Sequence, residues 1–231
     1  MPSGPTGSRT IDIRDSAKAR LVTKFTIDPR EAITKYRVVA VVGASKSPEK
    51  DAYSVPAYLQ SHGYTVVPVN PTADIIRGVK AYPSLAEIPE DTAKKVEVVD
   101  VFRPSEELPQ VARQVADMKE RTGRPFVFWG QLGLESEEAK EILAKAGVEY
   151  VMDRCIRTEH KILGSSRVSF GGRVNAGWHE AHQMPPNPTR NQRVKWHFDH
   201  AEACGCRPVP EDLKDDVRAM IRAADLAARA N

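Results

Sequence analysis

The sequence predicts an α/β protein, with a doubly wound parallel sheet of five strands followed by a helical and irregular C-terminal appendage. Three observations support this prediction. Short β-branched runs alternate with helical patterns up to about residue 163. After residue 164, Gly and Pro interrupt the chain and no such run returns. At 231 residues, the chain has room for one well-packed core and a small addition.

The elements follow one another in regular order. Asp28, Pro29 and Glu31 form a capping signature, which predicts a short helix over 29–35. A continuous apolar run over 38–42 is typical of a strand buried on both faces. A second buried strand is predicted over 65–69, and further strands over 96–102, 126–129 and 150–152. Helical patterns that each end at a glycine predict helices over 55–62, 106–121 and 136–146.

Strands and helices at this spacing form right-handed βαβ units, so we expect a Rossmann-like domain over 28–163 with strand order 3-2-1-4-5. Ligands of such sheets bind beyond the carboxyl ends of the strands, which selects the loops after Val42, Val69 and Val101. We expect residues 1–27 to form a disordered or extended tail. Residues 164–231 should form the appendage, which closes with an amphipathic helix from Glu211 onward.

Composition limits the classes of function. No apolar run is long enough to span a bilayer, and the first residues lack the basic-then-apolar order of a secretion signal. Three cysteines are too few for a disulfide framework, so we expect a reducing, cytoplasmic location. A net charge of +3 is too small for a general nucleic-acid-binding protein. The apolar closing helix is compatible with a homodimer.

The loop after the first strand has the residue types of a phosphate-binding turn. Gly43 permits close approach of the backbone, and the N-terminus of the following helix favours an anion. Ser45 can donate through its hydroxyl, while Lys46 and Lys50 add positive charge. The loop is neither G-x-G-x-x-G nor a Walker A motif, and an ordinary strand-to-helix turn explains it equally well.

The loop after the second strand argues against nicotinamide adenine dinucleotide. Sheets that bind this dinucleotide usually carry Asp or Glu there, which grips the ribose hydroxyls. This chain has Asn70 and Pro71 instead, so no carboxylate repels a phosphorylated ribose. Coenzyme A (CoA) carries such a phosphate, and so does NADP, which this step alone does not exclude. The alternative is that these two residues merely end a strand.

Several motifs occur together in a fixed order: Val41-Val42-Gly43-Ala44-Ser45, Gly63-Tyr64, Pro68-Val69-Asn70-Pro71, Asp100-Val101-Phe102-Arg103, Gln131-Leu132-Gly133 and Val151-Met152-Asp153-Arg154-Cys155-Ile156. In this order they resemble the small CoA-binding-domain proteins. They are similar to the CoA-binding domain of succinyl-CoA synthetase α-subunits and ADP-forming acyl-CoA synthetases. The resemblance covers most of the predicted sheet domain and stops before the appendage.

The resemblance implies three groups of binding residues: Gly43, Ala44, Ser45 and Lys46 around the pyrophosphate, Asn70 and Pro71 beside the adenosine, and Phe102, Arg103 and Pro104 along the third loop. It makes Arg103 a candidate for a phosphate contact, with a surface ion pair as the alternative.

We therefore expect a protein that binds CoA or an acyl-CoA and is not catalytic alone. The acyl-CoA ligases also need a phosphohistidine-bearing domain and an ATP-grasp partner, which this sequence does not show. Three alternatives remain: a subunit or remnant of an acyl-CoA ligase, an NADP-dependent oxidoreductase, and a metal-stabilised adaptor that binds protein or nucleic acid.

A concentration of histidine and cysteine in the appendage is outside the family pattern and predicts a metal site. Tetrahedral zinc takes four nitrogen and sulfur ligands, and a small appendage would gain folding energy from the ion. The preferred ligand set is His197, His200, Cys204 and Cys206, with His179 and His182 as less favoured candidates. The alternative is that helical histidines at this spacing only pack or form hydrogen bonds.

Overall fold

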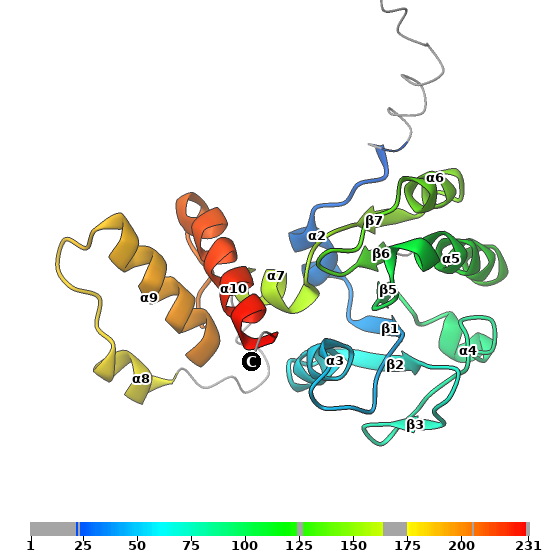
Figure 1. Cartoon of the computed structure of the whole chain (residues 1–231), viewed down its shortest axis with the longest axis horizontal. Helices are drawn as coiled ribbons and strands as arrows, with labels where there is room; N and C mark the ends of the chain where they lie inside the picture. Colours follow the sequence, from blue (N-terminus) through cyan, green and yellow to red (C-terminus); the bar gives the residue numbers. More distant parts are fainter. Residues whose placement is uncertain (1–21, 23, 124–126, 164–174, 205, 230–231) are drawn as a thin grey trace, which may run out of the picture.

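The computed structural model describes residue 22 and residues 24–123, 127–163, 175–204 and 206–229. Five parallel strands form the central sheet, as the sequence predicts (Figure 1). These strands are β1 (Val38–Val42), β2 (Thr65–Val69), β5 (Val98–Val101), β6 (Val127–Gly130) and β7 (Glu149–Val151). A two-stranded antiparallel hairpin, which periodicity did not indicate, consists of β3 (Ile75–Ile76) and β4 (Val79–Lys80).

Helices connect the strands and continue beyond them. In the sheet domain they are α2 (Pro29–Lys35), α3 (Asp51–Ser61), α4 (Glu90–Ala93), the 3-10 turn η1 (Ser105–Glu107), α5 (Leu108–Thr122), α6 (Glu137–Lys145) and α7 (Ile156–Leu163). In the appendage they are α8 (Ala176–Ala181), α9 (Arg190–Ala203), the 3-10 turn η2 (Glu211–Leu213) and α10 (Lys214–Arg229). Helix α2 has the predicted bounds, and the Asp28 side chain caps it by accepting from the Arg30 N–H.

The predicted strand order 3-2-1-4-5 is wrong. The observed order is β2-β1-β5-β6-β7, so the third strand of the sheet, β5, pairs with β1 and leaves β2 at the edge. Pro68 explains why β2 cannot be an internal strand, because proline offers no N–H to a second neighbour. The segment after β4 covers part of this edge through a bridge between Val69 and Tyr82.

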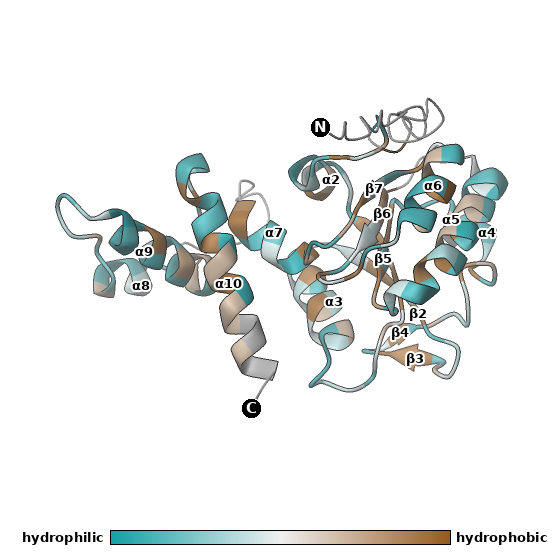
Figure 2. Ribbon diagram, turned by 45° about the horizontal axis from the view of Figure 1, so that its top comes forward, coloured by the Kyte–Doolittle hydropathy of each residue, from teal (hydrophilic) through white to brown (hydrophobic). Residues whose placement is uncertain are grey.

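Each face of the sheet has its own core, because successive residues of a strand point to opposite sides. Val99 and Val101 pack toward α4, α5 and α6, whereas Val98 belongs to the cluster under α2, α3 and α7. Figure 2 shows these two groups of helices on either side of the strands. Each helix therefore packs on one face of the sheet, and this determines the direction in which the loop before it leaves its strand.

The far edge of the sheet is also covered. Residues just before α2 run along β7, where the Tyr150 N–H donates to the Phe25 carbonyl and the Ile27 N–H to the Tyr150 carbonyl. Most of the predicted N-terminal tail, residues 1–21 and 23, lies outside the described residues. Within the described part of the chain, no helix has the length and apolar character needed to cross a bilayer.

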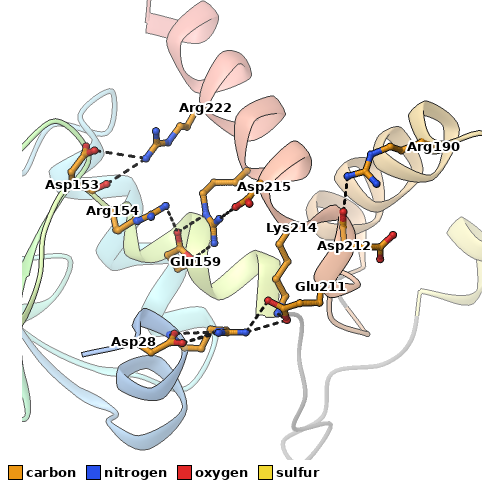
Figure 3. Close-up of polar contacts among 12 residues, drawn as sticks. Asp28, Asp153, Arg154, Glu159, Arg190, Glu211, Asp212, Lys214, Asp215 and Arg222 are labelled. Atoms are coloured by element: carbon orange, nitrogen blue, oxygen red, sulfur yellow. Dashed lines mark hydrogen bonds and ion pairs between the residues drawn. The ribbon is translucent and has the colours of Figure 1, made fainter. Parts of the chain in front are cut away.

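The appendage docks on the sheet domain through α7 and α10 (Figure 3). A small apolar cluster joins Ile162 of α7 to Val194 of α9 and to Leu213, Val217 and Ile221. Beside it, the Glu159 carboxylate is only 2% exposed and accepts from Arg218 Nε at 2.9 Å and from its NH2 group at 3.1 Å. Arg154 contributes a longer ion pair of 3.8 Å to the same carboxylate.

Candidate functional site at the switch point of the sheet

The observed strand order places the reversal of winding between β1 and β5. From β1 the chain turns to α3 on one face of the sheet, and from β5 it turns to α5 on the other. Loops that diverge in this way leave a crevice beyond the carboxyl ends of the two strands, which is where open α/β sheets bind ligands. Two of the three loops selected from the sequence thus border this crevice, and the loop after β2 lies beside them.

Gly43 is held against the loop that follows β5. Its φ of +84° is strained for any side chain. A Cβ built on it would lie 2.9 Å from the Phe102 carbonyl oxygen and 2.9 Å from Arg103 Cδ. The two loops are therefore in direct contact, and only glycine fits between them.

The rest of the first loop turns back on itself and leaves cationic side chains free. Ser45 Oγ accepts from the Ser47 N–H at 3.1 Å, and the Ser45 N–H donates to the Ala52 carbonyl. Helix α3 begins at Asp51, earlier than the predicted start at residue 55. No side chain caps its N-terminus at Lys50. Lys46 and Lys50 are exposed and form no ion pair with any described residue. The loop thus offers two ammonium groups to solvent, beside the carboxylates of Glu49 and Asp51.

Asn70 positions the second loop through its side-chain amide. Its Nδ2 donates to the Ala44 carbonyl at 2.7 Å, and its Oδ1 accepts from the Thr72 N–H at 2.7 Å. The amide is thus used within the protein, while Pro71 beside it is exposed. Asn70 accordingly ties the loop after β2 to the loop after β1.

Arg103 already has an anionic partner. Its Nε and NH2 groups donate to the two Glu107 carboxylate oxygens, each at 2.8 Å, four residues further along the chain. Both side chains remain more than a third exposed. Phe102 is half-buried against the core, and Pro104 is exposed. A phosphate that uses Arg103 must share it with Glu107.

A buried aspartate at the end of β5 is a feature that no site assignment from the sequence included. Asp100 is 0% exposed, and its Oδ1 accepts from Gln131 Nε2 at 2.7 Å. Its Oδ2 has no hydrogen-bond partner among the described residues. Burial raises the pKa of the Asp100 carboxyl to about 7. An aspartate inside the run Val98-Val99-Asp100-Val101 was the available signal.

The thiol of Cys155, which follows β7, is not activated. Burial raises the pKa of the Cys155 thiol, and this outweighs the hydrogen bonds from Thr158 and the charge of Arg157. A nucleophilic cysteine requires the opposite direction.

The appendage brings together a different histidine and cysteine set from the preferred one. One ligand atom from each of His179, His200, Cys204 and Cys206 lies within 4.8 Å of all the others. His197 is not a member: it is buried on α9, and its Nδ1 has no hydrogen-bond partner among the described residues. The spacing of three residues on α9 permits both histidines on one face. Only His200 lies with the two cysteines, however, and α8 supplies His179 as the fourth donor.

Aromatic rings surround this group. The Trp196 ring stacks on His200 with centroids 4.8 Å apart, and the Trp178 ring stacks on His182 at 4.6 Å. The two tryptophans also meet each other at 5.4 Å. These rings pack within the appendage, so they do not form a row of free stacking surfaces for nucleic-acid bases.

Comparison with known proteins identifies relatives of the sheet domain. A family model described as CoA binding domain matches residues 37–161. YneT, an uncharacterised protein of Bacillus subtilis (strain 168), is 40% identical over 133 residues, which are 58% of this chain and 92% of that protein. The ADP-forming acetate–CoA ligase II of Archaeoglobus fulgidus is 30% identical over 149 residues, 62% of this chain but only 22% of the ligase.

A solved structure agrees with this result. A hypothetical protein from Pyrococcus horikoshii OT3 has a TM-score of 0.51 at 33% identity, covering 70% of this chain and 96% of that one. The match to the family model ends within α7, so α8, α9 and α10 lie beyond it.

Proposed function

Because this chain belongs to the CoA binding domain family, we propose that it binds coenzyme A or an acyl-CoA at the crevice between β1 and β5. The observation that carries the proposal is the contact between two loops at the switch point. Gly43 allows the first loop to lie directly against Phe102 and Arg103, so one ligand can touch both. The protein acts in this proposal as a binding protein, without catalysis of its own.

The pyrophosphate is assigned to the loop from Gly43 to Lys46, in front of α3. Helix α3 has eleven residues and no side-chain cap, so its first N–H groups favour an anion. Lys46 and Lys50 form no ion pair with a described residue, although Glu49 and Asp51 flank Lys50 in the chain. Together these features supply the charge that a pyrophosphate needs.

The adenosine is assigned to the side of the crevice next to Asn70 and Pro71. Asn70 holds the first loop in place through the Ala44 carbonyl. It also leaves the end of β2 without the carboxylate that grips an unphosphorylated ribose. This arrangement favours a ribose that carries a phosphate, as in CoA.

The ligase activity of the Archaeoglobus fulgidus relative is not part of the proposal. This chain spans about a fifth of that protein's length, and the shared segment matches the CoA binding domain alone. An NADP-dependent reaction is the competing assignment, and a ligand comparison separates the two.

The test is the thermal stability of the full chain with CoA, 3′-dephospho-CoA, NADP and ATP, each at the same concentration. A ligand that binds only the folded protein raises the melting temperature, and at equal concentration the tighter ligand raises it more. We expect CoA to give the largest increase and dephospho-CoA a smaller one. A larger increase with NADP than with CoA would contradict the proposal.

A pair of charge reversals locates the site. Lys46→Glu should weaken CoA binding at least tenfold, about 1.4 kcal/mol, because a carboxylate replaces an ammonium beside the pyrophosphate. Lys95→Glu makes the same change at an exposed position before β5, at the amino ends of the strands, and should leave binding unchanged. Equal losses in the two variants would place the ligand elsewhere.

A further inference from the structure

A second cluster of chemically reactive side chains lies outside the sheet domain, where α8 meets the end of α9. His179 belongs to α8 and His200 to the last turn of α9, while Cys204 caps α9 and Cys206 follows it. One ligand atom from each residue lies within 4.8 Å of the other three. Four such donors from three separate positions of the backbone converge on one point.

The type and spacing of the donors fit one metal. Two imidazole nitrogens and two sulfurs are a complete tetrahedral ligand set for zinc. The metal–ligand bond lengths usual for zinc place a nitrogen and a sulfur about 3.6 Å apart. Cys206 Sγ lies 3.3 Å from His200 Nε2 and 3.4 Å from His179 Nε2. Small movements of these side chains would accommodate an ion.

The surroundings support a site that holds a metal in place. The Trp196 ring is stacked on His200, and the Trp178 ring meets His179 edge-on at 5.3 Å. The Asn175 N–H donates to Cys204 Sγ at 3.4 Å, a contact of the kind that stabilises a metal-bound thiolate. Four protein ligands leave no open coordination position, so the site suits a structural ion better than a catalytic one.

Apart from the contacts of its rings with Trp196 and a hydrogen bond from Trp196 to the His182 carbonyl, helix α8 has few contacts that hold it to α9. None of its residues is buried, and it contributes nothing to the apolar cluster formed by α7, α9, η2 and α10. A short helix without apolar burial is unstable by itself. An ion that links α8 to α9 would add to the contact between Trp178 and Trp196.

We propose that His179, His200, Cys204 and Cys206 bind one structural Zn²⁺, which fastens α8 to the C-terminal end of α9. The site is independent of CoA binding, because its residues lie beyond the family match. It retains three of the four ligands preferred from the sequence and replaces His197 by His179.

The experiment uses the full chain without an affinity tag, since a histidine tag would itself bind metal. Elemental analysis after gel filtration should find one zinc per chain. Replacement by Co²⁺ should give the intense visible bands of a tetrahedral site with thiolate charge transfer. Protein that contains no zinc and does not take up Zn²⁺ after refolding would overturn the proposal, as would a weak octahedral Co²⁺ spectrum.

Two matched pairs of variants identify the ligands. Cys206→Ser and His179→Asn should each weaken Zn²⁺ binding at least tenfold and alter the Co²⁺ spectrum. Cys155→Ser and His182→Asn should leave both unchanged, because Cys155 lies in the sheet domain and His182 stacks on Trp178 outside the ligand group. Loss of binding in His182→Asn but not in His179→Asn would contradict this ligand set.

Removal of the metal from the unmodified chain provides a readout that does not depend on a variant folding. Trp178 and Trp196 lie against the ligands, so a chelator should change tryptophan fluorescence and increase protease cleavage between α8 and α9. Added Zn²⁺ should reverse both effects. Fluorescence and cleavage that do not respond to the chelator would contradict a structural role.

Discussion

At the scale of single residues, Gly43 links the geometry of the sheet to ligand binding. It combines a positive φ with a contact so close that a Cβ would meet the Phe102 carbonyl oxygen at 2.9 Å. Gly63, at the C-terminal end of α3, has nearly the same φ of +83° but nothing within 4 Å of a Cβ. A comparison of the two glycines therefore distinguishes the cost of a positive φ, which both share, from the effect of the contact between loops, which only Gly43 makes.

We predict that Gly63→Ala lowers the free energy of unfolding by about 1–2 kcal/mol, the cost of a left-handed alanine. Gly43→Ala should cost more and should also weaken CoA binding, because the two loops must move apart. Urea unfolding and CoA titration of both variants measure this difference. Equal stability losses with intact CoA binding in Gly43→Ala would show that the loop contact has no role.

Asp100 makes stability depend on pH. Its pKa of about 7 in the folded protein exceeds the ordinary value of 3.8, so the folded state holds its proton more tightly than the unfolded state. The free energy of unfolding therefore falls as pH rises from about 4 to about 7, and the penalty is constant above that range.

Asp100→Asn should remove this penalty while it keeps an oxygen to accept from Gln131. We expect little difference from the natural chain near pH 4 and a variant more stable by about 4 kcal/mol above pH 7. Burial lowers the pKa of His160 to about 4, so its own contribution falls as pH decreases from 6.5. Because His160 is present in both the natural chain and the variant, its contribution cancels in the difference between their free energies of unfolding. A constant difference across the pH range would contradict the buried charge.

At the scale of elements, the contact between α7 and α10 includes one buried carboxylate beside the apolar cluster. Glu159 is 2% exposed and takes two hydrogen bonds from Arg218. Breaking a buried ion pair on one side is much more costly than neutralising both partners, because it leaves a charge without water. Arg190 and Asp216 form a comparable pair of 2.8 Å between α9 and α10, but both side chains are exposed.

Arg218→Met should therefore lower the free energy of unfolding by about 3–5 kcal/mol. Combining it with Glu159→Gln should restore most of that loss. Arg190→Met should cost less than about 1 kcal/mol, as expected for a surface pair. Urea unfolding followed by tryptophan fluorescence compares the three proteins. If Arg218→Met is no worse than Arg190→Met, the buried ion pair does not hold the appendage.

The helices and strands also show which features of the fold could be predicted from the sequence. Short apolar runs predicted all five strands, because strands buried on both faces carry few polar residues. The order of the strands was not predictable from that pattern, since periodicity says nothing about lateral neighbours. Pro68 is the residue that indicates the position of β2 in this order, because it marks β2 as an edge strand. The hairpin of β3 and β4 was too short to give a periodic signal.

The two candidate sites were likewise predictable only in part. The loops after β1 and β5 could be selected because carboxyl ends of parallel strands always share one edge of the sheet. The pairing of Arg103 with Glu107 required coordinates of both side chains. Likewise, His179 joins the metal group through the docking of α8 on α9, which local sequence does not determine.

At the scale of the whole molecule, two sites lie in two separate parts of the chain. The switch-point crevice belongs to the sheet domain that the family model matches. The histidine and cysteine group belongs to the appendage, which is joined to the sheet domain through α7 and α10. We therefore expect that removing the metal alters the appendage and leaves CoA binding intact.

The most direct test is isothermal titration of CoA into the full chain, with 3′-dephospho-CoA and NADP titrated under the same conditions. We expect saturable binding of one CoA per chain, with weaker binding of dephospho-CoA and of NADP. No binding of CoA, or binding of NADP more tightly than CoA, would contradict it.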